Sequence, residues 1–287
     1  IEMGKMDMIL TVTLNPSVDI RYQMDMFHLE TVNRVQDVEK TAGGKGLNVS
    51  RVLRQLGENV AATGFLGGSL GEFIRKKLGE MEIADHFVVC RGETRNCIAV
   101  IHEGKQTEIL EGGPTIAEEK SLFLQQFEKS VEHAEIITIS GSLPKGIPSN
   151  FYNELLKVSA DKGKPVLLDT SGEALQHALM CEQKPFFIKP NEEELAALVN
   201  RELKTEEAII NALENPLFDG VSWIAVTLGA KGALVKQGRQ VYRVTIPKVD
   251  AVNPVGSGDS VVAGFASGLS KGLSVEPLIQ YGMTMGL

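Results

Sequence analysis

A short loop near residue 256 carries the sharpest chemical signal in the sequence. Gly256 and Gly258 flank Ser257, and Asp259 follows at the start of an apolar helical run. Small residues let backbone N–H groups converge on one point, and a helix start adds partial positive charge, so the loop suits an anion such as a transferring phosphoryl group. Asp259, in the first turn, can accept a proton from an attacking hydroxyl. An ordinary helix cap formed by Ser257 fits the same spacing.

A second glycine-rich segment, Gly43-Gly44-Lys45-Gly46, leads into the helical pattern of residues 47–56, which contains Asn48. Glycines permit close backbone approach, and one flexible cation and one amide at a helix start can bind sugar hydroxyls or a phosphate. A glycine-rich turn with a solvated lysine is the alternative.

A third segment runs from Lys189 to Glu194, between a predicted strand and a predicted helix. Three consecutive acids in a first turn usually complement the helix dipole. Asn191 and Glu194 are three residues apart and share a helix face, so they could instead hold Mg²⁺ through water.

The sequence lacks the common nucleotide-binding loops. No Gly-Lys pair is followed by Ser or Thr, as a Walker loop requires, and Val261 stands where a dinucleotide-binding loop needs its third glycine.

An alternation of strands and helices must position these segments. Residues 9–14 form a continuous apolar, β-branched strand pattern, and strand and helix patterns alternate along the later part of the chain. This alternation predicts an α/β fold, a mostly parallel sheet with helices on both faces. The segments 19–39 and 94–111 contain no helix pattern and predict a small β appendage. The other expected strands are 97–102, 108–110, 135–140, 165–169, 186–189 and 223–227, and the expected helices are 47–56, 118–130, 150–160, 192–199, 206–213, 260–269 and 274–287.

Composition limits the class of protein. The chain has 287 residues, a formal net charge of −8 and 43% hydrophobic residues, which is typical of a globular protein. No apolar run approaches the length of a membrane span, and the acidic balance argues against nucleic-acid or anionic-membrane partners, while a small anionic substrate remains open. Three scattered cysteines and five histidines without metal-ligand spacing predict a reduced, cytoplasmic protein. The helical pattern still runs at residue 287, so we expect a C-terminal tail to be missing.

Taken in order along the chain, the motifs resemble the ribokinase-like (PfkB-type) carbohydrate kinase family. The resemblance extends from residue 9 to residue 287 and implies a single Rossmann-like domain, with a small β-sheet lid that often makes a homodimer contact. The motifs that carry it lie at residues 14–19, 43–48, 93–95, 140–144, 168–172, 189–194, 227–229 and 253–259.

The resemblance also implies roles for individual residues. Asp259 would be the catalytic base, and Gly256, Ser257 and Gly258 would form the anion hole for the transferring phosphoryl group. The sugar hydroxyls would meet Asp19, Gly43, Gly44 and Asn48, and an existing substrate phosphate would meet Lys45, Arg95 and Ser142. ATP would contact Lys189, Asn191, Thr227 and Gly229, and Mg²⁺ would be organised through water by Asn191 and Glu194.

Within the family, the chain resembles the branch that acts on sugars already carrying a phosphate. Residues 106–111 and 253–259 are most similar to tagatose-6-phosphate kinases, which form the 1,6-bisphosphate and serve lactose and tagatose catabolism. Residues 172–175 and 259–265 are more similar to phosphofructokinases, so a 1-phosphofructokinase is the alternative, and a minor 6-phosphofructokinase belongs to the same branch. A kinase of neutral sugars or nucleosides would not need Lys45 and Arg95, and a non-catalytic sugar or nucleotide sensor would not need a base at Asp259.

Overall fold

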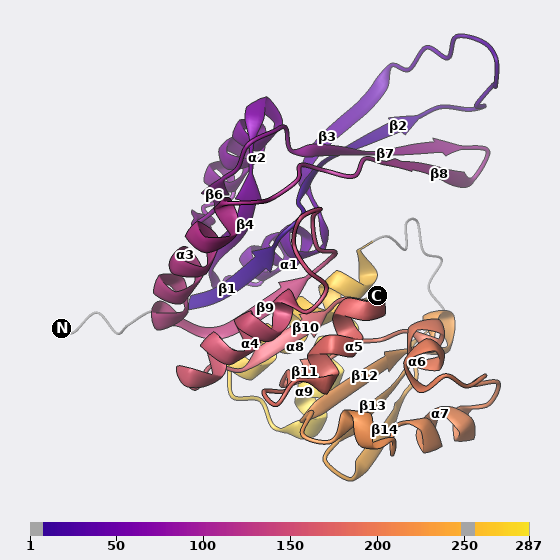
Figure 1. Cartoon of the computed structure of the whole chain (residues 1–287). Coiled ribbons are helices and arrows are strands. Elements are labelled where there is room, and N and C mark those ends of the chain that lie inside the picture. Colours follow the sequence, from indigo (N-terminus) through magenta and orange to yellow (C-terminus); the bar gives the residue numbers. More distant parts are fainter. Residues whose placement is uncertain (1–7, 248–255, 287) are drawn as a thin grey trace.

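The computed structural model describes residues 8–247 and 256–286. The first part of the predicted 253–259 motif, Asn253 to Val255, and the end of the predicted 274–287 helix, Leu287, lie outside these residues. The described chain forms one large and one small sheet, with helices on both faces of the large one (Figure 1). The predicted α/β class, with a mostly parallel sheet and a separate small sheet, is therefore confirmed.

The large sheet has ten strands in the order β14-β13-β12-β11-β10-β9-β1-β4-β5, with β6 also pairing with β4. Its centre is parallel, and the pairs β12–β13 and β13–β14 are antiparallel. The central strand β1 is buried along its whole length, which explains its unbroken apolar pattern. The strands are β1 (Met8–Thr13), β4 (Asn59–Leu66), β5 (Ala84–Asp85), β6 (Val88–Val89), β9 (Ala134–Ser140), β10 (Val166–Asp169), β11 (Phe187–Ile188), β12 (Trp223–Thr227), β13 (Ala233–Gln237) and β14 (Gln240–Val244).

Two hydrophobic cores cover the two faces of this sheet, because alternate strand residues point to opposite sides. In β1, Leu10 and Val12 belong to the core under α3 to α7, whereas Ile9 belongs to the core under α1, α2, α8 and α9. The helices are α1 (Lys45–Gln55), α2 (Gly68–Glu80), α3 (Glu119–His133), α4 (Phe151–Asp161), α5 (Gly172–Met180), α6 (Glu192–Val199), α7 (Glu206–Ala212), α8 (Ser257–Ser270) and α9 (Val275–Thr284). Two short 3₁₀ turns follow at Pro216–Phe218 and Gly229–Lys231.

The small sheet contains four strands in the order β3-β2-β7-β8 and projects from one end of the molecule (Figure 1). Its strands are β2 (Ser17–Gln23), β3 (Asp37–Gly43), β7 (Arg95–His102) and β8 (Lys105–Leu110). β7 and β8 lie within the predicted extended segment 94–111, whereas β2 begins two residues before and β3 ends four residues after the predicted segment 19–39. The alternation in β2 places Asp19 and Arg21 on one face, and Val18 and Ile20, which are buried in the hydrophobic core, on the other.

The polar segments follow the carboxyl ends of the parallel strands. Asp169 ends β10, Lys189 follows β11 and Thr227 ends β12. In open α/β sheets this edge is where ligands bind, because strand ends and helix starts meet there. The fold therefore collects residues that are far apart in sequence at one edge of the large sheet, beside the small sheet.

Candidate active site

A cleft of about 690 Å³ lies where the small sheet meets the carboxyl edge of the large sheet. One wall comes from the polar face of the small sheet, including Asp19, Arg95 and Cys97. The other side comes from the starts of helices α1 and α8 and from the ends of β10 and β11. Five cationic residues line it, namely Arg21, Lys45, Arg51, Arg95 and Lys189. Five acidic residues, Asp19, Glu39, Glu108, Asp169 and Asp259, line it as well, so the formal charges of the cleft balance in a protein with a net charge of −8.

Asp259 lies in the first turn of α8 and is only 6% exposed. Burial raises the pKa of its carboxyl group to about 6, and the neighbouring carboxylate of Asp169 adds to the shift, while a hydrogen bond from Asn48 and the charges of Lys45 and Lys189 oppose it. The Asn48 amide donates from Nδ2 to Oδ2 of Asp259 over 2.9 Å. A carboxylate with a raised pKa is suited to take up a proton near neutral pH.

The start of helix α8 is left open by its own side chains. Gly256 is the N-cap residue, in a left-handed conformation, and no side chain of the described residues caps this helix. The hydroxyl of Ser257 instead donates to the carbonyl oxygen of Gly286 over 2.6 Å. The alternative in which Ser257 caps its helix is therefore wrong, and no side chain of the described residues occupies the first backbone N–H groups, which suit an anion.

Asp169 joins two cations at the floor of the cleft. Its Oδ1 atom lies 3.4 Å from Nζ of Lys189, and its Oδ2 atom lies 3.6 Å from Nζ of Lys45. Burial by itself would lower the pKa of Lys45, but the carboxylates of Asp169, Asp259 and Glu194 outweigh burial and raise it. Lys45 therefore stays charged. A Cβ on Gly258 would lie 2.9 Å from Nζ of Lys189, which places this lysine against the start of α8.

The predicted sugar-binding residues meet at the base of the small sheet. Burial raises the pKa of the Asp19 carboxyl group, against hydrogen bonds from Ser17 and the Gly44 backbone and the charges of Arg95 and Arg51. Ser17 donates to Oδ1 of Asp19 over 2.6 Å. A Cβ on Gly43 would overlap the Asp19 carboxylate, so only glycine at this position lets the carboxylate lie where it does.

The three residues predicted for a substrate phosphate surround the loops after β1 and β9. Arg95 donates from Nε and Nη2 to the carbonyl oxygen of Asn15, over 3.3 and 3.1 Å. The side-chain amide of Asn15 donates to Oγ of Ser142 over 3.3 Å. Lys45 is next to Gly141, because a Cβ on that glycine would lie 3.8 Å from Cβ of Lys45. Asn15 thus links Arg95 to Ser142, and Lys45, which also faces Asp169, lies beside Gly141. Arg95 and Lys45 line the cleft, whereas Ser142 does not.

The residues predicted to bind ATP lie along the same edge. Asn191 forms an isolated bridge with Thr227, and Gly229 begins the 3₁₀ turn that follows. Asn191 and Glu194 form a reciprocal capping box, in which each side chain accepts a hydrogen bond from the other residue's backbone N–H. Apart from Lys189, none of these residues lines the cleft that the described side chains enclose.

The donor set fits a magnesium ion carried by a nucleotide better than one caged by protein. Within residues 8–247 and 256–286, no group of three or more His, Cys, Asp or Glu residues could hold a metal ion. The carboxylate of Glu194 lies near enough to Lys45 to raise the pKa of that lysine. Mg²⁺ commonly keeps several waters and takes one or two carboxylates besides substrate phosphates, and this arrangement allows such binding.

Two cleft residues with strong contacts are not among the predicted site residues. Asp169 belongs to the 168–172 motif and ends a predicted strand. Its position at the carboxyl end of that strand was the sequence signal that could have indicated a site residue. Arg51 has no motif signal, because it reads as an ordinary polar position on an amphipathic helix. In the structure its Nη2 atom donates to Oδ1 of Asn48 over 2.8 Å.

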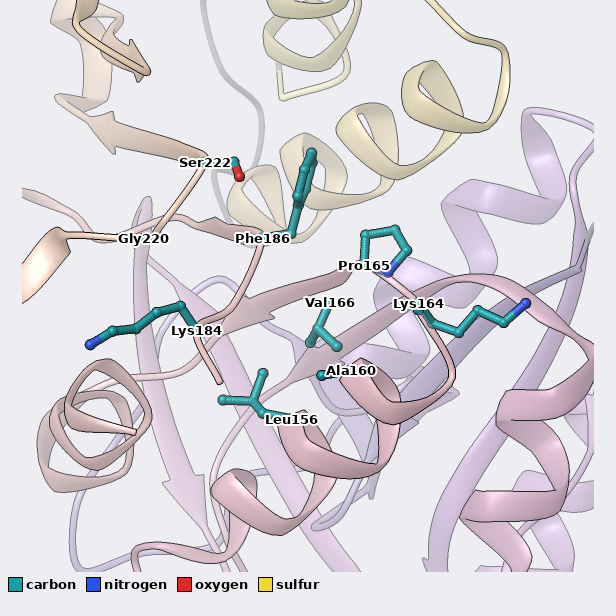
Figure 2. Close-up of a pocket in the computed structure, with 10 residues that line it drawn as sticks. Leu156, Ala160, Lys164, Pro165, Val166, Lys184, Phe186, Gly220 and Ser222 are labelled. Carbon is teal, nitrogen blue, oxygen red and sulfur yellow. The ribbon is translucent and has the colours of Figure 1, made fainter. Parts of the chain in front are cut away.

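A smaller hollow of about 300 Å³ lies at the opposite, amino-terminal edge of the large sheet (Figure 2). Lys164 and Lys184 point in different directions away from it, and Lys184 donates to the carbonyl oxygen of Leu179. The remaining lining is mostly apolar, including Leu156, Val166 and Phe186. It lacks the convergent polar groups that characterise ligand sites, so the larger cleft is the candidate active site.

None of the helices that the structure describes has the length and apolar character to cross a membrane.

Comparisons with known proteins agree with this geometry. Phosphofructokinase-2 from Escherichia coli, in complex with fructose-6-phosphate, matches at a TM-score of 0.89 and 30% identity, over 98% of this chain and 93% of that chain. A candidate 1-phosphofructokinase from Thermotoga maritima matches at 0.89 and 28%, over 98% and 91%. A candidate phosphofructokinase from Staphylococcus aureus matches at 0.83 and 35%, over 97% and 90%. The profile of the pfkB family of carbohydrate kinases matches residues 12–286. The chain therefore belongs to the pfkB family and is an ATP-dependent sugar phosphotransferase.

Proposed function

We propose that this kinase phosphorylates a sugar that already carries a phosphate, with D-tagatose 6-phosphate as the first candidate substrate and the 1,6-bisphosphate as product. The observation that carries the proposal is the position of Asp259. This buried carboxylate borders a cleft lined by five cationic and five acidic residues, with the cations Lys45 and Lys189 paired to Asp169, at a helix start that no side chain caps among the described residues. A proton acceptor, an anion site and positive charge thus occur together, as phosphoryl transfer to a phosphosugar requires.

In the proposed reaction Asp259 accepts the proton of the C1 hydroxyl as this oxygen attacks the γ-phosphorus of ATP. A bond forms between the sugar oxygen and phosphorus, the bond from phosphorus to the β,γ-bridging oxygen breaks, and ADP leaves with that electron pair. The backbone N–H groups of Ser257, Gly258 and Asp259 would stabilise the charge in transit. Lys45 and Lys189, which reach this point from opposite sides of Asp169, would add fixed positive charge.

The existing phosphate of the substrate would bind near Arg95, Ser142 and Lys45. Arg95 suits this role because a guanidinium group can donate to two phosphate oxygens at once. Its present contacts are with backbone carbonyl oxygens, which orient the group without neutralising its charge. Asp19, Gly43, Gly44 and Asn48 would then face the sugar hydroxyls.

ATP would lie along the edge marked by Lys189, Asn191, Thr227 and Gly229. Asn191 and Glu194 would hold nucleotide-borne Mg²⁺ through water, and the ion would supply further charge neutralisation at the phosphates. We also propose that the small sheet, which overlaps the predicted segments 19–39 and 94–111, is a lid on the single domain. Exposed apolar side chains on and beside it support a homodimer through this sheet, among them Met26, Leu29, Val32, Val38 and Ile109.

A 1-phosphofructokinase is the second candidate. Similarity to the Thermotoga maritima protein favours fructose 1-phosphate, and similarity to phosphofructokinase-2 favours fructose 6-phosphate. These substrates differ from tagatose 6-phosphate in one stereocentre or in the position of the phosphate, and such differences change a few hydroxyl contacts only. A non-catalytic sensor is disfavoured, because such a protein has no need to bury a carboxylate beside an anion site.

A coupled ADP-release assay tests the proposal. The panel contains tagatose 6-phosphate, fructose 1-phosphate, fructose 6-phosphate, free fructose and ribose, each at several concentrations with saturating ATP. We expect the highest kcat/KM with tagatose 6-phosphate and values lower by about tenfold or more with both free sugars. A preference for fructose 1-phosphate would select the second candidate, and comparable activity on free sugars would overturn the phosphosugar assignment.

A further inference from the structure

Arg51, Asn48 and Asp259 form a chain of hydrogen bonds in the cleft. Arg51 and Asn48 are three residues apart in α1, so their side chains lie on the same helix face. Nη2 of Arg51 donates to Oδ1 of Asn48 over 2.8 Å, and Nδ2 of Asn48 donates to Oδ2 of Asp259 over 2.9 Å. The chain thus connects α1 to the first turn of α8.

The direction of this chain follows from the chemistry of its ends. A guanidinium group can only donate hydrogen bonds, and an ionised carboxylate can only accept them. An asparagine amide has one end of each kind, so only one of its two flip states satisfies both neighbours. With Arg51 present, the amide must direct its NH₂ group at Asp259. Without Arg51, the amide could rotate and direct its oxygen at the carboxylate.

We propose that Arg51 is a positioning residue for the phosphoryl-transfer reaction, which locks the Asn48 amide so that it donates to the catalytic carboxylate of Asp259. The proposal rests on the assigned role of Asp259 as the base. Arg51 needs no contact with the sugar for this function. It keeps the donor on Oδ2, so that the substrate proton can go to Oδ1 of Asp259.

The charges around Asp259 show why this donor matters. Burial and the carboxylate of Asp169 both favour the protonated form of Asp259, and the Asn48 hydrogen bond, Lys45 and Lys189 favour the ionised form. These groups come from α1, β10 and the segment after β11, and the Asn48 contribution is the largest of the three that favour ionisation. If the amide reversed, this contribution would be lost and an oxygen would face the carboxylate. The base would then ionise only at higher pH.

The pH dependence of kcat/KM tests the proposal with Arg51→Met. In the unchanged protein, kcat/KM should rise near pH 6 as Asp259 ionises, and we call this rise the acidic limb. In Arg51→Met we expect the acidic limb to move up by about one pH unit, because the ionised form of Asp259 loses one charge-assisted hydrogen bond. Activity at pH 6 should fall about fivefold, whereas activity at pH 8.5 should largely recover. Arg51→Lys keeps a pure donor at this position and should restore the limb to within a few tenths of a unit.

Two comparisons separate positioning from other roles. In an Asn48→Ala background, Arg51→Met should no longer move the limb, because Arg51 acts through the amide. Arg54→Met is the matched control, since Arg54 lies in the same helix but binds the backbone of Met81 and Glu58 and the Glu82 carboxylate. It should lower the melting temperature and leave the limb in place.

Three outcomes would overturn the proposal. They are an unmoved limb in Arg51→Met, a shift that persists in the Asn48→Ala background, or an effect confined to the KM for the sugar, which would indicate direct substrate contact. None of these bears on the proposed function, which is tested separately by Asp259→Asn. If Asp259→Asn keeps full turnover, the base assignment fails first.

Discussion

Nζ of Lys189 lies 3.4 Å from Oδ1 of Asp169, and both side chains are less than 10% exposed. The pair therefore forms a buried ion pair, with the lysine following strand β11 and the carboxylate ending strand β10. The second oxygen of Asp169 faces Lys45 at 3.6 Å. One carboxylate from the large sheet thus holds two cations at the place where donor and acceptor phosphates would meet.

Asp169→Asn should therefore affect both stability and the base. Removing one partner of a buried pair leaves an uncompensated charge on Lys189, and we expect a loss of roughly 3 kcal/mol in the free energy of unfolding. The acidic limb of the pH–rate profile should move down, because Asp169 raises the pKa of Asp259. Urea denaturation and a pH profile measure the two effects. A limb that moved upward would contradict this account of the charges.

The elements that carry motifs were predictable, and those held by packing alone were less so. Helix α6 spans the predicted residues 192–199, because its capping residue and its acidic first turn are local signals. Strand β4 and helix α2 were not predicted. Alanines and Gly64 weaken the strand pattern of β4, and the glycines at 67, 68 and 71 hide the start of α2, whose Ile74 and Leu78 are nevertheless fully buried.

Asp259→Asn should stabilise the folded protein near neutral pH. Because the pKa of Asp259 is raised, its favourable contribution to stability is present below pH 4 and is lost as the pH rises through about 6. Asparagine keeps an acceptor for Asn48 but carries no charge. We expect a gain of about 1–3 kcal/mol at pH 7.5 and a much smaller gain at pH 4. Thermal denaturation at both pH values checks this, and equal changes at both would contradict the burial of an ionised group.

Gly43→Ala should displace Asp19. A Cβ at this position would overlap the Asp19 carboxylate, which Ser17 holds from the other side. We expect the KM for the sugar to rise about tenfold or more, while the KM for ATP changes little, because the change lies on the small-sheet side of the cleft. Gly57→Ala serves as the control, since no atom lies within 4 Å of a Cβ there; its positive φ should cost some stability without changing either KM.

Arg95→Ala should separate a phosphosugar kinase from a kinase of neutral sugars. If Arg95 binds the existing phosphate, loss of its charge-assisted hydrogen bonds should lower kcat/KM for the phosphosugar by about 100-fold and leave ATP binding intact. Arg95→Lys should recover part of this loss, since it keeps the charge but not the planar fork. A small effect of Arg95→Ala on a fully folded variant would contradict the placement of the phosphate.

The site was predictable where chemistry lies in short segments and hidden where it depends on neighbours from other elements. The loop at residues 256–259 and the segment at 43–48 could be recognised from glycine spacing and a following helix. Asp169 and Arg51 gain their roles only when β10, β11, α1 and α8 meet. Asp169 pairs with Lys45 and Lys189, and Arg51 reaches the distant Asp259 through its helix neighbour Asn48. For Ser257 the sequence suggested a side-chain role, but its hydroxyl contacts Gly286. The proposed anion site therefore depends on backbone N–H groups.

The most direct test of the central claim is the turnover of Asp259→Asn with saturating ATP and tagatose 6-phosphate, measured as ADP release, with ATP affinity followed by calorimetry. Asparagine has nearly the same shape and can still accept from Asn48, but it cannot take the substrate proton. We predict a loss of about 1,000-fold or more in kcat with ATP affinity within a few-fold of the unchanged protein. Turnover close to that of the unchanged protein would contradict the assignment of Asp259 as the base.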